Sequence, residues 1–209
     1  MDASKVRVAL VLGAVLGLAA CESPTAPEPP TPKITSLTIS GTTSIGDLGE
    51  TTQLTATARS SDGAAQDVTA QAQWSSDGDP LTRVVSVISP GLIRAERYGK
   101  GGVHATYGSA SAQAEVRVGP DGAFLVTVDV SDHGFATDGA RVQATSSAGT
   151  FSATTNLWGF VSLPAVGETT LQVEKAGFRT IAASVTVSSD QDFDFVLQPS
   201  DEASSTTTR

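Results

Sequence analysis

The chain has 209 residues, and 13 Lys and Arg against 22 Asp and Glu give it a formal net charge of −9. A nucleic-acid-binding surface needs a basic stripe to contact phosphates, so this charge balance argues against a nucleic-acid partner. Cys21 is the single cysteine, which excludes an intramolecular disulfide and cysteine-based zinc or iron–sulfur centres. With 20 glycines and 17% charged residues, the composition favours an all-β surface protein, and we expect no cofactor.

Residues 1–20 have the pattern of an export signal. Lys5 and Arg7 precede an uncharged apolar stretch that is shorter than the roughly 20 residues a bilayer-spanning helix needs. The stretch ends in Leu18-Ala19-Ala20-Cys21, which resembles the lipobox of bacterial lipoproteins. In that family the chain is cut before the cysteine, which then carries the lipid, so the resemblance implies a membrane anchor at Cys21. The alternative is an ordinary signal peptide with a chance cysteine.

The segment after Cys21 is predicted to be a tether. By the sorting rule of enteric lipoproteins, Asp in the next position favours the inner membrane, so Glu22 implies an outer-membrane location in the cell envelope. Residues 22–32 hold half of the ten prolines and favour an extended polyproline II conformation. At about 3.1 Å per residue they reach roughly 34 Å. Residues 21–32 would therefore lift the folded part away from the membrane.

The remaining chain is predicted to contain two domains, separated by the turn-forming sequence Gly119-Pro120-Asp121-Gly122. The aromatic composition changes at this sequence, since all seven Phe lie at or beyond Phe124 and both Tyr lie at or before Tyr107. We predict a first domain, a second domain and a flexible tail over residues 33–118, 121–198 and 199–209.

The first domain alternates apolar and polar residues with a period of two. Leu54, Ala56 and Ala58 share one face, and Thr55 and Thr57 lie on the other. Several such runs, separated by turns rich in Gly, Asp and Pro, predict a β-sandwich or a barrel.

Specific motifs in the first domain resemble the group 2 bacterial Ig-like domain. They are Leu37-Thr38-Ile39, the segments 49–56 and 67–69, Trp74-Ser75-Ser76 and Ser89-Pro90-Gly91-Leu92-Ile93. The resemblance covers nearly all of residues 33–118 and implies an Ig-like sandwich with Trp74 in its core. One departure is the long segment from Asp79 to Val87.

A second departure is Gly99-Lys100-Gly101-Gly102, which we expect to form a glycine-rich β-turn. A phosphate-binding Walker loop would need a Ser or Thr after the lysine and a following helix, and neither is present in the sequence pattern.

The second domain also alternates, with Phe124, Val126, Val128 and Val130 on one face. Segments 139–142, 155–164 and 176–178 resemble the carboxypeptidase regulatory-like domain, a small transthyretin-like β-sandwich. The predicted fold class is therefore all-β, with two tandem sandwiches, Ig-like and then transthyretin-like. Neither family brings catalytic residues to this chain.

The sequence gives no support for catalysis or for a metal site. His104 lies in an alternating strand and His133 in a turn, and no G-x-S-x-G nucleophile motif is present. Asp129, Asp132 and Asp138 lie close together in sequence, but their spacing does not match a calcium loop. We expect solvated loop carboxylates, no metal and no enzymatic activity.

Leu157, Trp158 and Phe160 are the candidate binding residues, because the resemblance places them at a hairpin tip. Exposed aromatic rings there would form a platform for sugar rings or for a protein partner. The alternative, which we favour from the sequence, is that Trp158 packs over the edge of its own sandwich or against the first domain.

These observations predict a non-catalytic, lipid-anchored cell-envelope protein that presents two β-sandwiches for binding, adhesion or spacing. The alternative function is a carbohydrate-binding module that uses the aromatic tip. The expected partners are the membrane, through the lipid, and a surface glycan or an envelope protein.

Overall fold

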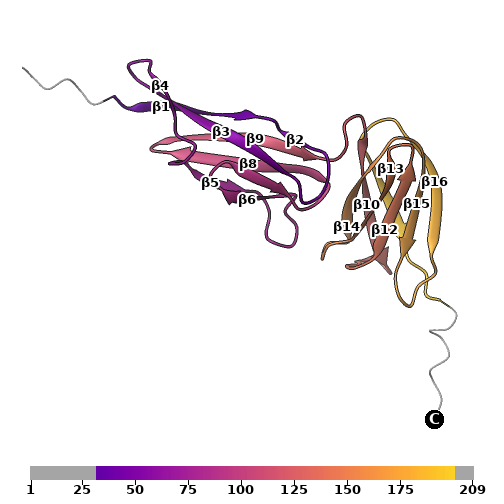
Figure 1. The fold of residues 1–209 in the computed structure, drawn as a ribbon. Coiled ribbons are helices and arrows are strands. Elements are labelled where there is room, and N and C mark those ends of the chain that lie inside the picture. The colour runs from indigo at the N-terminus through magenta and orange to yellow at the C-terminus, as the bar shows by residue number, and fades with distance from the viewer. Residues whose placement is uncertain (1–31, 201–209) are drawn as a thin grey trace, which may run out of the picture. The chain divides into compact units, whose positions relative to one another are not determined.

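The computed structural model describes residues 32–200, and every regular element in this range is a β-strand (Figure 1). The predicted all-β fold class is therefore confirmed. The predictions for the export signal, for Cys21 and for the tether up to residue 31 lie outside the described residues. Within the described part of the chain no helix is long and apolar enough to cross a membrane.

Strands β1 to β9 form two sheets, which we call the first sandwich. One sheet has the order β1-β3-β7-β6, with β4 paired to β3, and the other has the order β2-β9-β8-β5. All neighbours are antiparallel except β2 and β9. The strands are β1 (Ile34–Gly41), β2 (Ser44–Ile45), β3 (Thr51–Ser60), β4 (Ala65–Asp67), β5 (Gln73–Ser76), β6 (Val85–Ser89), β7 (Leu92–Ala95), β8 (Gly99–Tyr107) and β9 (Ala110–Val118).

Strands β10 to β17 form two further sheets, which we call the second sandwich. One sheet has the order β11-β10-β14, with β17 also paired to β10, and the other has the order β13-β12-β15-β16. The strands are β10 (Phe124–Asp132), β11 (Phe135–Ala136), β12 (Arg141–Ser146), β13 (Gly149–Thr154), β14 (Phe160–Ala165), β15 (Gly167–Glu174), β16 (Ile181–Val187) and β17 (Gln191–Val196).

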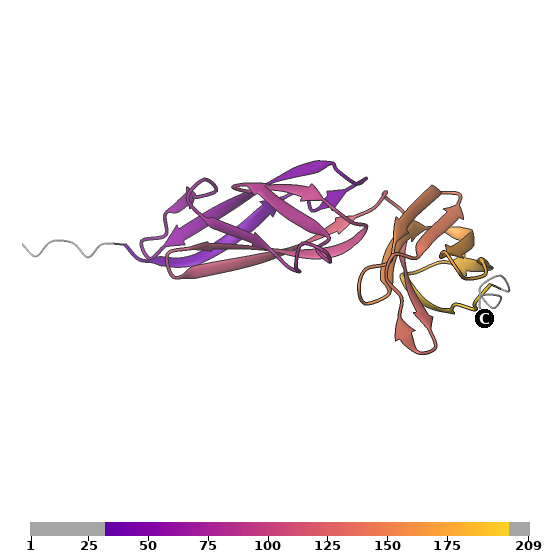
Figure 2. The same ribbon diagram turned by 90° about the horizontal axis from the view of Figure 1, so that it is seen from below.

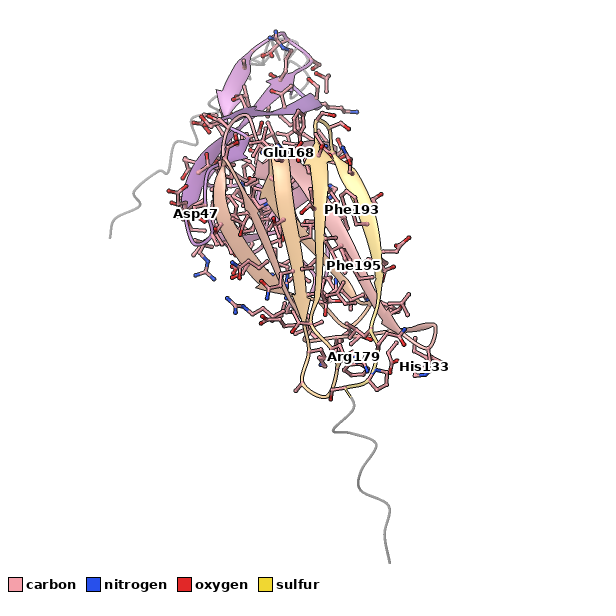
Figure 3. The ribbon with its side chains drawn as sticks, turned by 90° about the vertical axis from the view of Figure 1, so that its right-hand side faces the viewer. Asp47, His133, Glu168, Arg179, Phe193 and Phe195 are labelled. Atoms are coloured by element: carbon pink, nitrogen blue, oxygen red, sulfur yellow. The ribbon has the colours of Figure 1, made fainter. Side chains whose placement is uncertain are left out.

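The predicted alternation decides which faces are buried. Leu54, Ala56 and Ala58 of β3 are buried in the first sandwich, as are Val126 and Val128 of β10 in the second. Because successive side chains of a strand point to opposite faces, the residues between them lie on the outer faces of the sheets. Phe193 and Phe195 alternate along β17 in the same pattern, with exposed Asp194 between them (Figure 3).

Residues 119–122 contain no strand, and no sheet in the described chain takes strands from both sides of this joint (Figures 1 and 2). The apolar core nevertheless continues through it, since buried residues of both sandwiches belong to one hydrophobic cluster. The described residues, 32–200, also fall within one compact unit. The division at this joint into separately folding domains therefore stays a prediction.

Polar contacts fix the same joint. Arg117 donates hydrogen bonds to the carbonyl oxygens of Gly119 and Ala123. Lys100 Nζ lies 2.7 Å from Asp190 Oδ2, and the other oxygen of Asp190 accepts the Leu125 N–H at 2.9 Å. The Lys100 ammonium and the Leu125 amide hold the pKa of the Asp190 carboxyl below its ordinary value. A charged Asp190 thus links β8 to the start of β10.

The predicted glycine-rich turn at residues 99–102 is wrong, because these residues begin strand β8 and pair with β9. Their lack of side chains instead permits close packing. A Cβ at Gly101 would lie 3.0 Å from Val84 Cβ, and one at Gly102 would lie 2.1 Å from Asp77 Oδ2. The glycines therefore mark places where neighbouring segments approach the strand.

Two further expectations need adjustment. Trp74 is half-buried rather than enclosed, although it packs against the core and its Nε1 donates to the Thr69 carbonyl at 3.0 Å.

Pro199, assigned to the flexible tail, forms a β-bridge with Phe178, and the Ser200 amide donates to the Gly177 carbonyl. The predicted tail thus loses its first two residues, and residues 201–209 lie outside the described chain.

Candidate binding site

The segment that carries Leu157 and Trp158 connects β13 to β14. These two strands belong to different sheets and do not pair with each other, so the segment crosses between sheets. The predicted hairpin tip is therefore wrong. β13 pairs with β12 instead, while β14 pairs with β10, because the alternating apolar side chains of each strand must face the core between the sheets. We call residues 155–160 the aromatic loop.

The large side chains of the aromatic loop are exposed. Leu157 is 59% exposed, Trp158 66% and Phe160 44%. The packed arrangement that we favoured for Trp158 is therefore wrong. The loop crosses between the sheets at an edge of the sandwich, where the outward-pointing side chains find no neighbouring strand to cover them.

Hydrogen bonds fix the backbone of this loop. The Asn156 side-chain oxygen accepts the N–H groups of Trp158 at 2.9 Å and Phe160 at 3.0 Å. The Gly159 carbonyl accepts the Val130 N–H at 2.9 Å, which ties the loop to β10. Buried Thr155 accepts the Ala140 N–H through its hydroxyl. The rings are therefore presented from an ordered backbone rather than from a free loop.

Phe135 is an exposed aromatic residue that the sequence analysis did not select. It lies on the short strand β11 and is 76% exposed. His133 precedes it at a positive φ of 49°, in the turn between β10 and β11. Figure 3 shows His133 and Arg179 at one end of the second sandwich and Glu168 at the other. Phe135 could have been noticed in the sequence, because it is a large apolar residue directly after the turn residues His133 and Gly134.

Two carboxylates lie side by side on neighbouring strands, one on β10 and one on β17. Asp129 lies opposite Asp194 of β17 and, on the other side, opposite Phe160 of β14. Partial burial raises the pKa of Asp129 above its ordinary value, and the charge of Asp194 raises it further. These acids belong to a strand face rather than to a metal-binding loop.

A cleft of about 450 Å³ lies beside the aromatic loop. β13 and β14 are the outermost strands of their sheets on this flank, and Thr82, Val84 and residues 96–98 of the first sandwich lie against it. Asn156 and Phe160 line the cleft, so two residues belong to both the loop and the cleft. Such a volume is within the usual range of small-molecule sites.

Tyr98 lines this cleft and is 8% exposed. Its hydroxyl donates to Asp47 Oδ1 at 2.6 Å. Burial raises the pKa of the Tyr98 hydroxyl far above its ordinary value, and the Asp47 carboxylate raises it further. Tyr98 therefore stays neutral and acts as a fixed wall.

Charged groups also line the cleft. The Glu96 carboxylate accepts hydrogen bonds from Ser86 at 2.5 Å and from Arg94 at 2.6 Å. Ser86 and Arg94 lower the pKa of Glu96, which remains an anion already matched by a cation. Arg97 and Arg141 supply the positive groups of the cleft, and sequence reasoning had no signal for either.

The described residues do not assemble a hydrolytic or metal centre. His104 Nε2 lies 2.6 Å from Asp77 Oδ1, and Ser75 lies opposite His104 in the ladder of β5 and β8. No hydrogen bond joins Ser75 to His104 within residues 32–200, so the nucleophile–base contact of a triad is not made there. The same range contains no cluster of three or more His, Cys, Asp or Glu that could hold a metal.

No protein-family model matches the chain, and a comparison with curated proteins finds no match. The two family resemblances of the sandwiches therefore stay predictions. Among solved structures, the chain is similar to the Bacillus anthracis TIE protein, with 11% identity and a TM-score of 0.31 over 77% of this chain and 40% of that chain.

Two other solved structures show the same level of similarity. The major pilin subunit BcpA of Bacillus cereus has 10% identity and a TM-score of 0.31 over 81% of this chain and 71% of that chain. The S-layer protein rSbsC(31-844) has 14% identity and a TM-score of 0.33 over 75% of this chain and 28% of that chain. Scores this low carry no inference about what this chain binds or does.

Proposed function

We propose that this protein is a non-catalytic, lipid-anchored component of the bacterial cell envelope whose two β-sandwiches display a binding surface. The anchor rests on Cys21, the single cysteine, which lies where the lipobox-like sequence needs it. Glu22 favours the outer membrane, and the proline-rich segment that follows separates the folded part from the lipid. Stable anchoring requires more than one acyl chain, as in the lipoprotein family.

The exposed aromatic loop is the observation that carries the binding role. Surface-exposed Trp and Phe rings expose large apolar areas to water, which a soluble domain does not need for folding. Here they lie on a backbone that Asn156 holds in place. A rigid aromatic side chain gives contact area to a partner at a low cost in conformational entropy.

The anchor is tested by Cys21→Ser in the full chain. We expect the variant to lose radiolabelled palmitate incorporation and to move from the membrane fraction to the soluble fraction. Ser23→Ala, two positions further along the chain, is the matched control and should leave labelling and fractionation unchanged. Unchanged labelling of Cys21→Ser would reject the lipoprotein proposal.

Carbohydrate binding is the second candidate function. It is favoured by the exposed rings of Trp158 and Phe160, because a flat aromatic face stacks on the apolar face of a sugar ring. A glycan array with the purified chain tests it, and Trp158→Ala should lose the signals that the unmodified chain gives. An array without signals would favour a protein partner or a spacing role.

A further inference from the structure

We infer that the cleft between Arg97 and Arg141 is a binding site for an acidic saccharide, a sugar chain that carries carboxylate groups. The inference rests on the carbohydrate-binding candidate and specifies its ligand class. Three properties of the cleft support it: an arginine without an ionic partner, polar side chains without hydrogen-bond partners, and an aromatic ring at the rim.

Arg97 is held in place but its charge is unmatched. Its backbone N–H donates to the Val84 carbonyl at 3.1 Å, which fixes the position of its Cα. Its guanidinium has no hydrogen bond or ion pair to any residue in the range 32–200. In a chain with net charge −9, a half-buried arginine that faces a cleft and lacks a carboxylate partner leaves a positive site for an anion.

Arg141 adds a second positive group to the lining. Its Nη1 lies 3.7 Å from Glu174 Oε2, a long contact between two exposed side chains that contributes little. Glu96, the acid of the lining, is already paired with Arg94. The cleft therefore has a positive balance, and two guanidinium groups match the planar geometry of a carboxylate.

The other lining groups suit hydroxyls and a sugar ring. Ser152 and Thr154 of β13 line the cleft, and neither side-chain hydroxyl has a hydrogen-bond partner in the described chain. Phe160, 44% exposed, offers a ring face on the opposite edge strand β14. A saccharide supplies donors and acceptors for these exposed hydroxyls next to an apolar ring face that stacks on Phe160.

The first experiment is isothermal titration calorimetry of the full chain with tri-galacturonic acid and with its methyl ester. The ester keeps the rings and hydroxyls but removes the charge. We expect binding of the acid, at least about tenfold weaker binding of the ester, and weaker binding of the acid at higher salt. Acetate, titrated alone, should bind only weakly, because it lacks the sugar ring.

Variants then assign the site. Arg97→Gln should weaken binding of the acid by at least about tenfold and leave the ester unchanged, since only the acid presents an anion. Phe160→Ala should weaken both ligands. The matched control is Arg59→Gln on β3, outside the lining, which should change neither affinity. Circular dichroism of each variant shows whether the fold is retained.

The outcomes separate this inference from the functions proposed above. Equal affinity for acid and ester, or acid binding that Arg97→Gln leaves intact, would overturn the acidic-saccharide site while leaving neutral carbohydrate binding possible at Trp158. Tighter binding of free acetate than of the sugar acid would reduce the cleft to a simple anion site. Absence of binding to any saccharide on the array and in the titrations would reject the carbohydrate candidate as well, without touching the lipid anchor.

Discussion

Tyr98 of the first sandwich packs edge-on against Phe151 of the second, with ring centroids 5.5 Å apart and ring planes at 82°. This T-shaped geometry places the positive edge of one ring against the negative face of the other and is worth about 1 kcal/mol beyond the area that it buries. Together with the ion pair of Lys100 and Asp190, it joins residues from opposite sides of the 119–122 joint. The two sandwiches are thus in contact beyond their covalent connection.

This contact sharpens the prediction that the two domains fold separately. Expressed alone, residues 33–118 and 121–198 should each give dispersed amide NMR spectra, because each contains complete sheets. Each fragment should also melt below the temperature of the full chain, since Tyr98 and Phe151 become exposed on separation. A collapsed spectrum from residues 121–198 would show that the second sandwich depends on the first.

The two tryptophans should differ in their effect on stability. Trp74→Ala removes a half-buried ring and its hydrogen bond to Thr69, and we expect a loss of about 3 kcal/mol in the free energy of unfolding. Trp158→Ala removes an exposed ring and should change stability by less than about 0.5 kcal/mol. Urea denaturation followed by circular dichroism measures both. Equal losses would mean that Trp158 is structural and would end the platform proposal.

Gly159 should be required for the shape of the aromatic loop. It has a φ of +82°, and a Cβ there would lie 2.6 Å from the Val130 carbonyl oxygen. Gly159→Ala should therefore destabilise the protein by about 2 kcal/mol or more and shift the amide resonances of Trp158. Gly134→Ala is the matched control, because Gly134 has a φ of +85° but open space at the Cβ position. If both variants lose the same stability, the cost is the backbone conformation alone and the close packing on Val130 is unimportant.

Asp129→Asn should stabilise the protein at neutral pH. The raised pKa of Asp129 means that the folded state binds a proton more readily than the unfolded state. The ionised group therefore destabilises the fold, and this penalty is lost as pH falls through the raised pKa toward the ordinary value of 3.8. Because solvent screens the partly exposed pair, we expect Asp129→Asn to raise the free energy of unfolding by only about 0.5 kcal/mol at pH 7. This difference from the unmodified chain should disappear near pH 3.

The melting temperatures of Asp129→Asn and the unmodified chain across this pH range test the sign. Asp192→Asn is the control, since Asp192 lies opposite Thr127 in the same ladder rather than opposite another acid. A larger gain from Asp192→Asn would show that the net charge of the chain, and not the pair of Asp129 and Asp194, sets the effect.

Much of the fold could be predicted because alternation is local information. Leu54, Ala56 and Ala58 are buried because every second side chain of a strand faces the same sheet surface. The error at residues 99–102 arises because the structure there depends on a contact with another segment, which is not local information. A glycine indicates either a turn or a close approach, and the approaching residue at Gly101 is Val84, which sequence patterning did not place beside it.

The candidate site was predictable only in part. Trp158 and Phe160 were selected because the family resemblance placed them at a hairpin tip, but their path between two sheets depends on which strands pair. The cleft depends on contacts between sandwiches. Arg97 and Arg141 lie in different sandwiches, far apart in the sequence, and neither belongs to a motif that would have brought them together.

The parallel pairing of β10 and β17 has a mechanical consequence. β10 starts at the joint with the first sandwich, and β17 is the last strand of the described chain, with Val126 opposite Gln191 and Ser131 opposite Val196. A pull between the start of β10 and the end of β17 acts along both strands, so it loads all the hydrogen bonds of their ladder at once. Under the envelope role proposed above, tension along the chain would therefore be resisted here by shear, instead of opening one hydrogen bond at a time.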